Sequence, residues 1–235
     1  SVTASGTVTN DDTATTASAL TLDLTTAGNT LTGAATDDYV DGSLDGSNQT
    51  LTSSDTIDGG AGTDTLFAEI NGSGTYTPTV TNVEVMQGLF SATGSISLLK
   101  SSGVTTFENL DSTAAVSFTN IPSAAGVTLK GSNSAQNVTL GFTAAAGVGT
   151  SDSISVELSN VTGGTYSLAL IETVNVESND TANDITLSGS KITTVNATGA
   201  QNLTLNTLPS AVATLDASAL TGTITATLSK TAGGT

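Results

Sequence analysis

The chain has 235 residues and a net charge of −17, with 21 acidic residues against four basic ones, no histidine and no cysteine. Such a surface repels the phosphates of nucleic acids and anionic lipid heads, and the lack of cysteine removes disulfides and thiolate metal sites. No apolar run approaches the roughly 18 to 20 residues of a membrane span. Threonine, serine and apolar residues dominate while good helix formers are scarce, so the composition predicts an all-β protein with neither a nucleic-acid partner nor membrane insertion.

The acidic residues are concentrated near the start of the chain. Residues 1 to 99 hold ten aspartates and two glutamates but no basic residue, whereas residues 100 to 235 hold nine acids and four lysines. Dense carboxylate without counter-charge suggests bound cations, and calcium takes the oxygen ligands that this region has in excess. An acidic surface kept only for solubility is the alternative.

Residues 1 to 12, "SVTASGTVTNDD", contain one isolated strand pattern, which we interpret as the end of a preceding module or a linker. Residues 1 to 30 lack the basic and apolar regions of a signal peptide. We therefore expect export by a route without an N-terminal signal, in a chain whose natural start precedes Ser1. Residues 13 to 78 form an Asp/Gly-rich segment, which ends in the connector "NGSGTYTP" at 71–78.

The stretch "TIDGGAGTDTL" at 56–66 is the strongest motif of this segment. A nucleotide-binding loop would need Lys-Ser/Thr after the last glycine, where this chain has Thr63 and Asp64. The stretch instead matches the calcium-binding nonapeptide G-G-x-G-x-D-x-U-x, in which the glycines turn the backbone and Leu66 is the apolar anchor. An Asp-Gly turn with solvated carboxylates remains the alternative.

A degenerate second copy, "GAATDDYVD", lies at 33–41. If the two turns stack, Asp38 and Asp64 face the same ion, and further acidic residues lie close by in the sequence. Calcium takes six to eight oxygens, including backbone carbonyls at glycine turns. The candidate calcium ligands of residues 13 to 78 are Asp38, Asp41, Asp45, Asp55, Asp58, Gly60, Gly62 and Asp64.

Residues 79 to 235 contain a repeat of about twenty residues. Seven segments share the order apolar, Ser or Thr, apolar, and their middle residues are Ser97, Ser117, Thr139, Ser167, Thr186, Thr204 and Thr225. A second strand-like segment precedes each, as in "IETVNVES" (171–178) and "ITTVNATG" (192–199). Two short strands per repeat without a helix predict a parallel β-solenoid of about seven coils. We expect the Ser/Thr residues to form an outward ladder and the leading residues Ile171 and Ile192 to lie beyond a bend. The expected core residues are Val138, Leu140, Ile185, Leu187, Leu203 and Leu205. An antiparallel β-sandwich is the structural alternative.

These motifs, "TLTSSDTIDGGAGTDTL" followed by units such as "VTNVEVMQ" and "IETVNVES", resemble the calcium-binding repeats-in-toxin (RTX) superfamily, in particular large bacterial surface-layer proteins and adhesins of type I secretion. "GTVTNDD" at 6–12 resembles the strand and acidic linker that close Calx-β or cadherin-like modules of such adhesins. The resemblance implies that Asp11 and Asp12, with Asp38, Asp58 and Asp64, are calcium ligands. The family's long arrays of consecutive nonapeptides are absent, so we expect one or two ions.

We expect a non-enzymatic extracellular structural module of a bacterial cell-surface assembly: a surface layer, a surface filament or an adhesin stalk, stiffened by calcium. Without histidine or cysteine an ordinary nucleophile-base pair is missing. The last repeat ends without a polar cap, which suggests that its open edge is covered by further chain or by a neighbouring subunit. We therefore expect homo-assembly through a surface or the open solenoid edge. The alternatives are an adhesin domain that binds a cell-surface glycan or a protein and, less favoured, an ice-binding or a polysaccharide-degrading solenoid.

Overall fold

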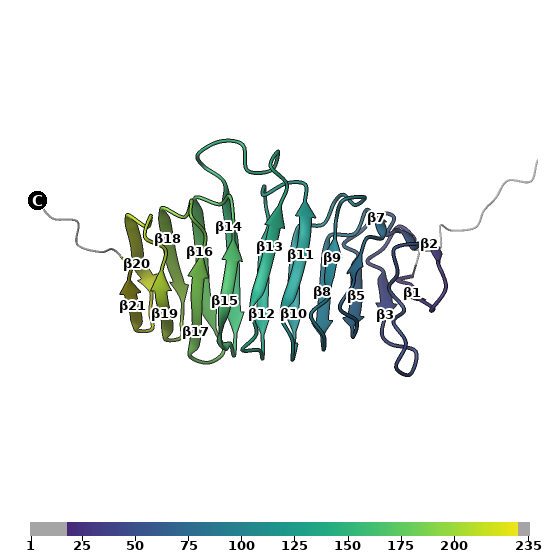
Figure 1. Cartoon of the computed structure of the whole chain (residues 1–235), viewed down its shortest axis with the longest axis horizontal. Helices are drawn as coiled ribbons and strands as arrows, with labels where there is room; N and C mark the ends of the chain where they lie inside the picture. Colours follow the sequence, from purple (N-terminus) through teal and green to yellow (C-terminus); the bar gives the residue numbers. More distant parts are fainter. Residues whose placement is uncertain (1–17, 230–235) are drawn as a thin grey trace, which may run out of the picture.

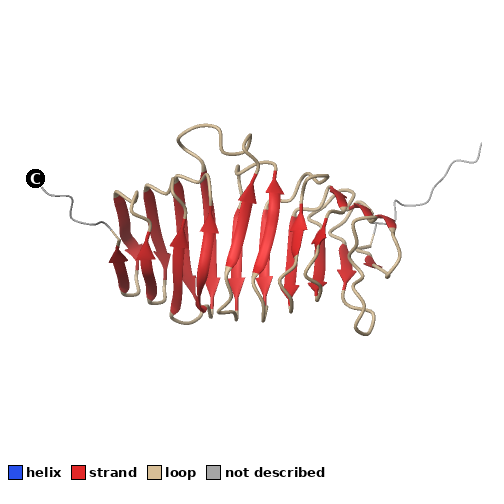
Figure 2. Cartoon of the chain, viewed as in Figure 1, coloured by secondary structure: helices blue, strands red, loops and turns tan. Residues whose placement is uncertain are grey.

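The computed structural model describes residues 18–229, and all regular structure in that range is β-strand (Figure 2). The strands wind into a solenoid whose coils follow one another along a single long axis (Figure 1). No helix that is long and apolar enough to cross a membrane occurs among these residues. Residues 1 to 12, with Asp11 and Asp12, lie outside the described range, so the expectations for them stay predictions.

The strands form three sheets. The ten-stranded sheet takes one strand from every coil: β1 (Thr21–Asp23), β3 (Tyr39–Gly42), β5 (Thr65–Ile70), β8 (Val85–Phe90), β10 (Thr106–Leu110), β12 (Thr128–Ser132), β14 (Ser153–Ser159), β16 (Thr173–Asn179), β18 (Thr194–Gly199) and β20 (Thr214–Leu220). The eight-stranded sheet contains β6 (Thr75–Tyr76), β9 (Ser95–Ser97), β11 (Val116–Ile121), β13 (Val138–Phe142), β15 (Thr162–Leu168), β17 (Asn183–Ser188), β19 (Leu203–Leu208) and β21 (Ile224–Leu228). The third sheet contains β2 (Thr30–Thr32), β4 (Thr56–Asp58) and β7 (Thr79–Thr81).

Every pair of neighbouring strands in these sheets is parallel, which confirms the solenoid and excludes the antiparallel sandwich. The ten-stranded sheet has ten coils: residues 79 to 235 contribute the predicted seven, and the Asp/Gly-rich segment, expected to precede the solenoid, adds three. At about 4.8 Å per strand, its first and last strands lie about 43 Å apart. In the added coils the strands β1 to β4 have only three or four residues and offer too short a pattern to align.

At the connector, residues 71–78, one side of the solenoid changes from the three-stranded to the eight-stranded sheet, whereas the ten-stranded sheet continues without a break. β5 pairs with β8 across it over six residue pairs, so the ten-stranded sheet is continuous from the Asp/Gly-rich segment into the predicted solenoid. Within the same coil, β6 begins the eight-stranded sheet and β7 ends the three-stranded one. The first two coils therefore have a different cross-section from the last seven, on one continuous sheet.

The interior is filled by columns of apolar side chains, because strand residues alternate between inside and outside as in β5 and β8. Val174 lies beside Val195 and then Leu215, as the aligned repeats predict. The leading residues Ile171 and Ile192, expected beyond a bend, precede β16 and β18 and are fully buried. The predicted core residues Val138, Leu140, Ile185, Leu187, Leu203 and Leu205 are all at most 2% exposed.

The predicted Ser/Thr ladder is interrupted. Ser117, Thr139 and Ser167 are direct neighbours, but Thr186 lies beside Thr165, and Thr204 lies beside Asp184. Each break shifts the register by two residues. Because side chains alternate between the two faces of a strand, such a shift keeps the apolar residues inside the solenoid but interrupts the outward column of Ser and Thr. Ser97 is buried and accepts a hydrogen bond from Asn120, so it does not extend the ladder outward.

Asparagine and aspartate form one row of corners, at the ends of β10, β12, β14 and β16. Asp111, Asn133, Asn160 and Asp180 there have φ between 47° and 61°, the left-handed region that these two residue types tolerate best after glycine. Their side chains also join the coils: Asn160 donates to Asn133 Oδ1 at 2.8 Å and accepts from Thr181 Oγ1 at 3.1 Å. The sharp turn and the contact between coils thus come from the same residue.

Tyr166 is fully buried, and its hydroxyl has no hydrogen-bond partner among the described residues. Burial raises the pKa of this phenol above its usual range. The ring fits because Gly131, on β12, has no side chain: a Cβ there would lie 2.1 Å from the Tyr166 hydroxyl oxygen. The glycine thus makes room for the tyrosine.

We predict that Gly131→Ala lowers the free energy of unfolding by about 1–3 kcal/mol, the usual cost of overpacking a core. Tyr166→Phe removes the obstructing atom, so the same alanine costs less in a Tyr166→Phe background. Urea unfolding of the two single variants and the double variant measures this coupling. Equal costs of the alanine in both backgrounds would contradict the contact.

Candidate functional site

The first coils hold many carboxylates and no basic residue. Residues 18 to 99 contain ten acidic residues, and the four lysines of the chain all follow residue 99. The ion pairs of the described residues accordingly lie further along, between Lys130 and Glu108 or Glu157 and between Lys191 and Glu172. The N-terminal coils therefore stack like charges at short range without compensation from side chains.

Three carboxylates occupy equivalent positions in successive coils, one residue before the strands β3, β5 and β8. Each accepts a hydrogen bond from a backbone N–H of the preceding coil: Asp38 Oδ1 from Leu20 at 2.6 Å, Asp64 Oδ1 from Asp38 at 2.7 Å and Glu84 Oε2 from Asp64 at 2.9 Å. We call Asp38, Asp64 and Glu84 the carboxylate column. These side chains join consecutive coils at the corner where each strand begins.

Asp38 is fully satisfied within this column. Its second oxygen, Oδ2, accepts the backbone N–H of Ala34, and Thr36 Oγ1 donates to Oδ1 at 3.3 Å. The backbone hydrogen bonds from Ala34 and then Leu20 lower the pKa of this carboxyl, against the opposing effect of burial. Asp38 is therefore held as a carboxylate that caps the turn of its own coil and the corner of the coil before it.

Asp64 has the opposite environment. It is 1% exposed, and its Oδ2 atom has no hydrogen-bond partner among the described residues. Burial raises the pKa of Asp64 most; the N–H of Asp38 lowers it, and the nearby charges of Glu84, Asp38 and Asp37 raise it further. A buried, unpaired carboxylate oxygen among other acids is a position that a proton or a cation would stabilise.

The two predicted nonapeptide turns do stack. Ala61 donates its N–H to the Ala34 carbonyl at 3.0 Å, and Thr63 donates its N–H to Asp37 Oδ1 at 2.8 Å. Gly60 and Gly62 have φ of 94° and 141°, and a Cβ at either would lie within 2.6 Å of backbone atoms of residues 34 or 36. The glycines of the motif are thus required for the close approach of one turn to the other.

Asp55 and Asp58 lie on the three-stranded side and do not join the column. Asp55, 1% exposed, accepts the backbone N–H of Asn29 at 2.7 Å and that of Thr52 at 2.6 Å, one on each oxygen. Asp58 Oδ1 accepts the N–H of Gly60 at 3.1 Å and Asn82 Nδ2 at 2.8 Å. Both carboxylates cap turns.

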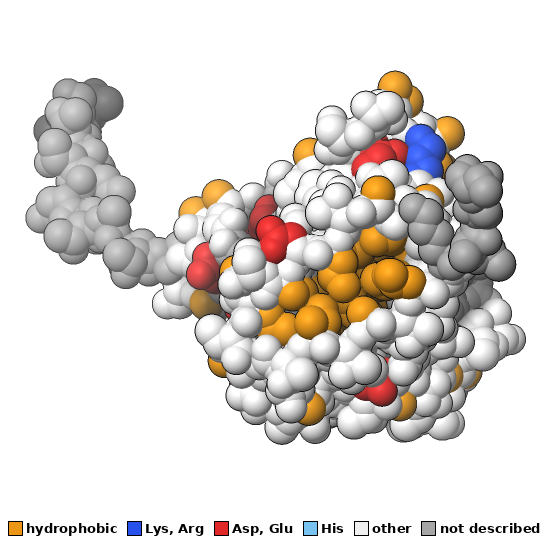
Figure 3. All heavy atoms as spheres, turned by 90° about the vertical axis from the view of Figure 1, so that its left-hand side faces the viewer, with side chains coloured by type: hydrophobic (Ala, Val, Ile, Leu, Met, Phe, Trp, Pro, Cys, Tyr) orange, Lys and Arg blue, Asp and Glu red, His pale blue; other side chains and the backbone are white. Residues whose placement is uncertain are grey.

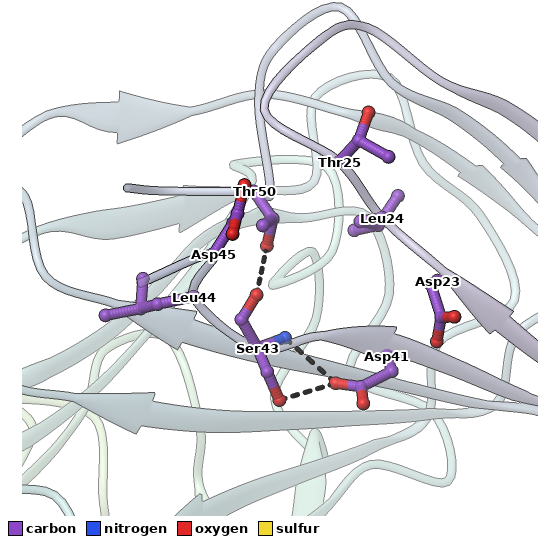
Figure 4. Close-up of a pocket in the computed structure, with 8 residues that line it drawn as sticks. All are labelled: Asp23, Leu24, Thr25, Asp41, Ser43, Leu44, Asp45 and Thr50. Atoms are coloured by element: carbon purple, nitrogen blue, oxygen red, sulfur yellow. Dashed lines mark hydrogen bonds between the residues drawn. The ribbon is translucent and has the colours of Figure 1, made fainter. Parts of the chain in front are cut away.

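Asp41 and Asp45 lie beside an open hollow of about 290 Å³ (Figure 4), together with Asp23. Asp23 and Asp41 are direct neighbours on the parallel strands β1 and β3. Asp41 Oδ1 accepts from Ser43 N at 2.9 Å and Ser43 Oγ at 2.6 Å. Sequence reasoning missed Asp23, although Leu22-Asp23 repeats the apolar-Asp order of Val40-Asp41 and thereby gave a signal.

The chemistry at Asp64 fits a hard cation, because one buried carboxylate oxygen there has no partner among the described residues and the chain has no histidine or cysteine to offer nitrogen or sulfur ligands. A calcium ion at Asp64 would need carbonyl or water oxygens to complete its shell. Within residues 18–229 no three acidic side chains lie close enough to hold a metal ion by themselves. Thus Asp38 and Asp64 are brought together, Asp41 and Asp45 lie at the separate hollow, and Asp55 and Asp58 lie apart from both.

Comparison with models of known protein families and with curated proteins gives no match to this chain. The resemblance to RTX surface proteins therefore rests on the motif residues themselves, above all Gly59 to Leu66. The calcium ligands that it implies stay predictions, and the geometry of Asp38 and Asp64 is the structural observation that bears on them.

We predict that Asp55→Asn lowers the free energy of unfolding by about 1–3 kcal/mol, since the amide leaves one buried N–H of Asn29 or Thr52 without an acceptor. Asp45→Asn, which replaces an exposed carboxylate, is the matched control and should change stability by less than about 0.5 kcal/mol. Urea unfolding in chelator measures both. Equal effects of the two substitutions would contradict the capping role of Asp55.

Proposed function

We propose that this chain is a non-enzymatic structural module of a bacterial cell-surface assembly, such as a surface layer, a surface filament or an adhesin stalk. We further propose that it is exported by type I secretion and that calcium stiffens its N-terminal coils. The observation that carries the proposal is the continuous stack of ten coils on one sheet. A stack in which every coil contacts only its neighbours along one axis has the shape of a spacer.

The composition supports a role outside the cell that does not involve catalysis. The chain has no histidine, cysteine or arginine, so a nucleophile would lack the usual base, and only four scattered lysines could stabilise an oxyanion. A rod without cysteine also keeps its structure independent of the redox state of its surroundings. Its stability depends instead on apolar columns and on side-chain caps such as Asp38, Asp55 and Asn183.

Calcium would supply the positive charge that the first coils lack. The carboxylate column places Asp38, Asp64 and Glu84 in consecutive coils, and the free Oδ2 of Asp64 would gain a partner when an ion binds. Calcium bound to Asp64 would also reduce repulsion between the stacked carboxylates. The proposal therefore assigns the ion a mechanical role, that of stiffening the end of the rod.

Glycan binding is a second candidate, favoured by a polar hollow of about 530 Å³ over β10, β12, β14 and β16. Lys130 is one of its lining residues, and its Nζ lies 3.2 Å from Glu108 and 4.0 Å from Glu157; Ser132, Ser159 and Asn179 also line the hollow. Hydroxyl, amide and carboxylate groups are the partners that sugar hydroxyls use. Glu108, Lys130 and Glu157 are direct neighbours in the sheet, a row that the repeat alignment did not reveal.

We predict that calcium raises the melting temperature of the chain and that magnesium does so less. At a free calcium concentration about 100 times the dissociation constant, binding contributes about 2.7 kcal/mol, which corresponds to about 5–10 °C for a chain of this size. Asp64→Asn should abolish most of this shift, because the free carboxylate oxygen is lost. Without calcium this variant should be at least as stable as the original chain, because a buried negative charge is removed.

The control is Asp216→Asn, which also removes one negative charge but from an exposed aspartate of the last coil. It should leave the calcium-dependent shift in melting temperature unchanged. Differential scanning calorimetry in calcium and in chelator provides the measurement. A melting temperature that is the same in calcium and in chelator would refute the proposed role of calcium. A shift retained in Asp64→Asn would refute the assignment to Asp64.

A further inference from the structure

The two nonapeptide turns that stack on each other correspond position by position. β2 pairs with β4, and β3 pairs with β5, without a shift in register. The segments between these strands are equally long in the two coils, so each residue of the first turn has one counterpart in the second. Ala34 corresponds to Gly60, and Asp38 corresponds to Asp64. The two aspartates thus stand in the same framework of strands.

In both turns one carboxylate oxygen lies against the first glycine of the motif. A Cβ on Gly33 would lie 2.5 Å from Asp38 Oδ2, and a Cβ on Gly59 would lie 2.6 Å from Asp64 Oδ2. The N–H of the residue after the glycine is therefore close to the carboxylate in either coil. In the first coil the hydrogen bond forms, because the N–H of Ala34 donates to Asp38 Oδ2.

The corresponding N–H of the second coil, that of Gly60, is turned away from Asp64. It donates to Asp58 Oδ1 at 3.1 Å, and Asp64 Oδ2 has no hydrogen-bond partner among the described residues. Gly60 has a φ of 94°, a left-handed value that glycine reaches without strain, whereas Ala34 keeps a negative φ. In the first coil Thr32 lies beside Asp58 and offers no carboxylate to the turn.

The next coil fixes the position of Asp58. Asn82, the residue after β7, donates its Nδ2 to the same Oδ1 atom at 2.8 Å. Oδ1 of Asp58 thus accepts one hydrogen bond from its own turn and one from the coil that follows. Asp58 can therefore orient the N–H of Gly60 before any ion binds.

We propose that Asp58 is a positioning residue, which holds the N–H of Gly60 away from Asp64 and so keeps Asp64 Oδ2 available to a calcium ion. The first coil lacks such a residue, so Asp38 is capped by its own turn and takes no ion through Oδ2. The inference rests on the proposed role of calcium and deepens it. It assigns one ion to the two turns, and it gives Asp58 a role other than that of a ligand.

The physical reason is competition for one oxygen. An N–H that caps a carboxylate oxygen has to be displaced before a cation can bind the same lone pairs, and this displacement lowers the apparent affinity. Hydrogen bonds to charged groups are strong enough to weaken binding by about tenfold or more. Asp58 removes this competitor from Asp64, at the cost of one further negative charge in the turn.

Calorimetric titration of the 235-residue chain with calcium tests the proposal through two substitutions that remove the same charge. Asp58→Asn keeps an oxygen that can accept the N–H of Gly60, whereas Asp58→Ala offers none. We expect Asp58→Ala to bind the ion that depends on Asp64 at least about tenfold more weakly than Asp58→Asn does. Asp64→Asn identifies that ion in the titration, because it removes the free oxygen.

The reverse change should create a site in the first coil. Thr32→Asp combined with Ala34→Gly copies the second turn onto the first, and Thr32 is exposed, so the new carboxylate should not disturb folding. We expect this variant to bind one more calcium ion than the original chain. Thr30→Asp combined with Ala34→Gly is the matched control, since it adds the same charge at another exposed residue of β2, away from the capping position. It should bind no additional ion.

Equal calcium affinity of Asp58→Ala and Asp58→Asn would overturn the positioning role and leave the calcium proposal standing. The same would follow if the Thr32→Asp variant bound no more ions than its Thr30→Asp control. If the original chain bound no calcium, both the calcium proposal and this inference would fall. Circular dichroism shows whether each variant is folded, and the Thr32→Asp pair decides the question if Asp58→Ala does not fold.

Discussion

Coil-on-coil stacking at about 4.8 Å is the constraint on which the rest of this molecule depends. Where the register is continuous, each strand residue of a coil lies beside its counterpart in the next coil, so a residue type that recurs at one position forms a column along the rod. Apolar positions become the columns of the core, as with Val174, Val195 and Leu215. Acidic positions become columns of like charge, which are stable only where other groups compensate them.

Hydrogen bonds from the backbone provide much of that compensation. A corner of the solenoid leaves N–H groups that the ladder does not use, and a carboxylate or amide in the next coil accepts them. Asp38 and Asp55 each accept one such N–H from the coil before and one N–H from a turn of their own coil, and Asn183 accepts the N–H of Val161 at 2.8 Å in a later coil. Several acidic residues of the first coils are thus structural caps, and among the described acidic residues before residue 99 Asp64 alone retains a free buried oxygen, as Asp152 does in a later coil.

The first and last described coils differ in strand length and in charge. In the first coils the strands shorten to three residues and acidic side chains accumulate, so these coils add little apolar contact. In the last described coil, β20 and β21 have seven and five residues, and apolar residues line a hollow beside them (Figure 3). This asymmetry gives the described rod a direction, with the carboxylates that could bind an ion at one side only.

Sequence reasoning succeeded where one residue type recurs at one place in every coil. The apolar pairs around Thr139 and Thr204 were sufficient to predict the solenoid and its inward residues. The repeats of residues 79 to 235 predicted their seven coils, but the three coils before them were not recognised as part of the solenoid, because the strands near Leu22 and Leu31 are too short to show alternation. The register between Ser167 and Thr186 shifts at a bulge that spacing alone does not reveal. The stacking of Asp38 and Asp64 followed from the repeated motif, whereas the separate roles of Asp55 and Asp41 depend on which N–H groups the turns leave free.

The central claim is that the rod is a structural element whose acidic first coils are stiffened by calcium. Hydrogen–deuterium exchange of the whole chain, in calcium and in chelator, tests it residue by residue. The account predicts slower exchange in calcium at the amides of residues 20 to 84, with those around Asp38 and Asp64 affected most, and unchanged exchange in the coils from β12 onward. Identical exchange in both conditions, or a change spread evenly along the rod, would contradict it.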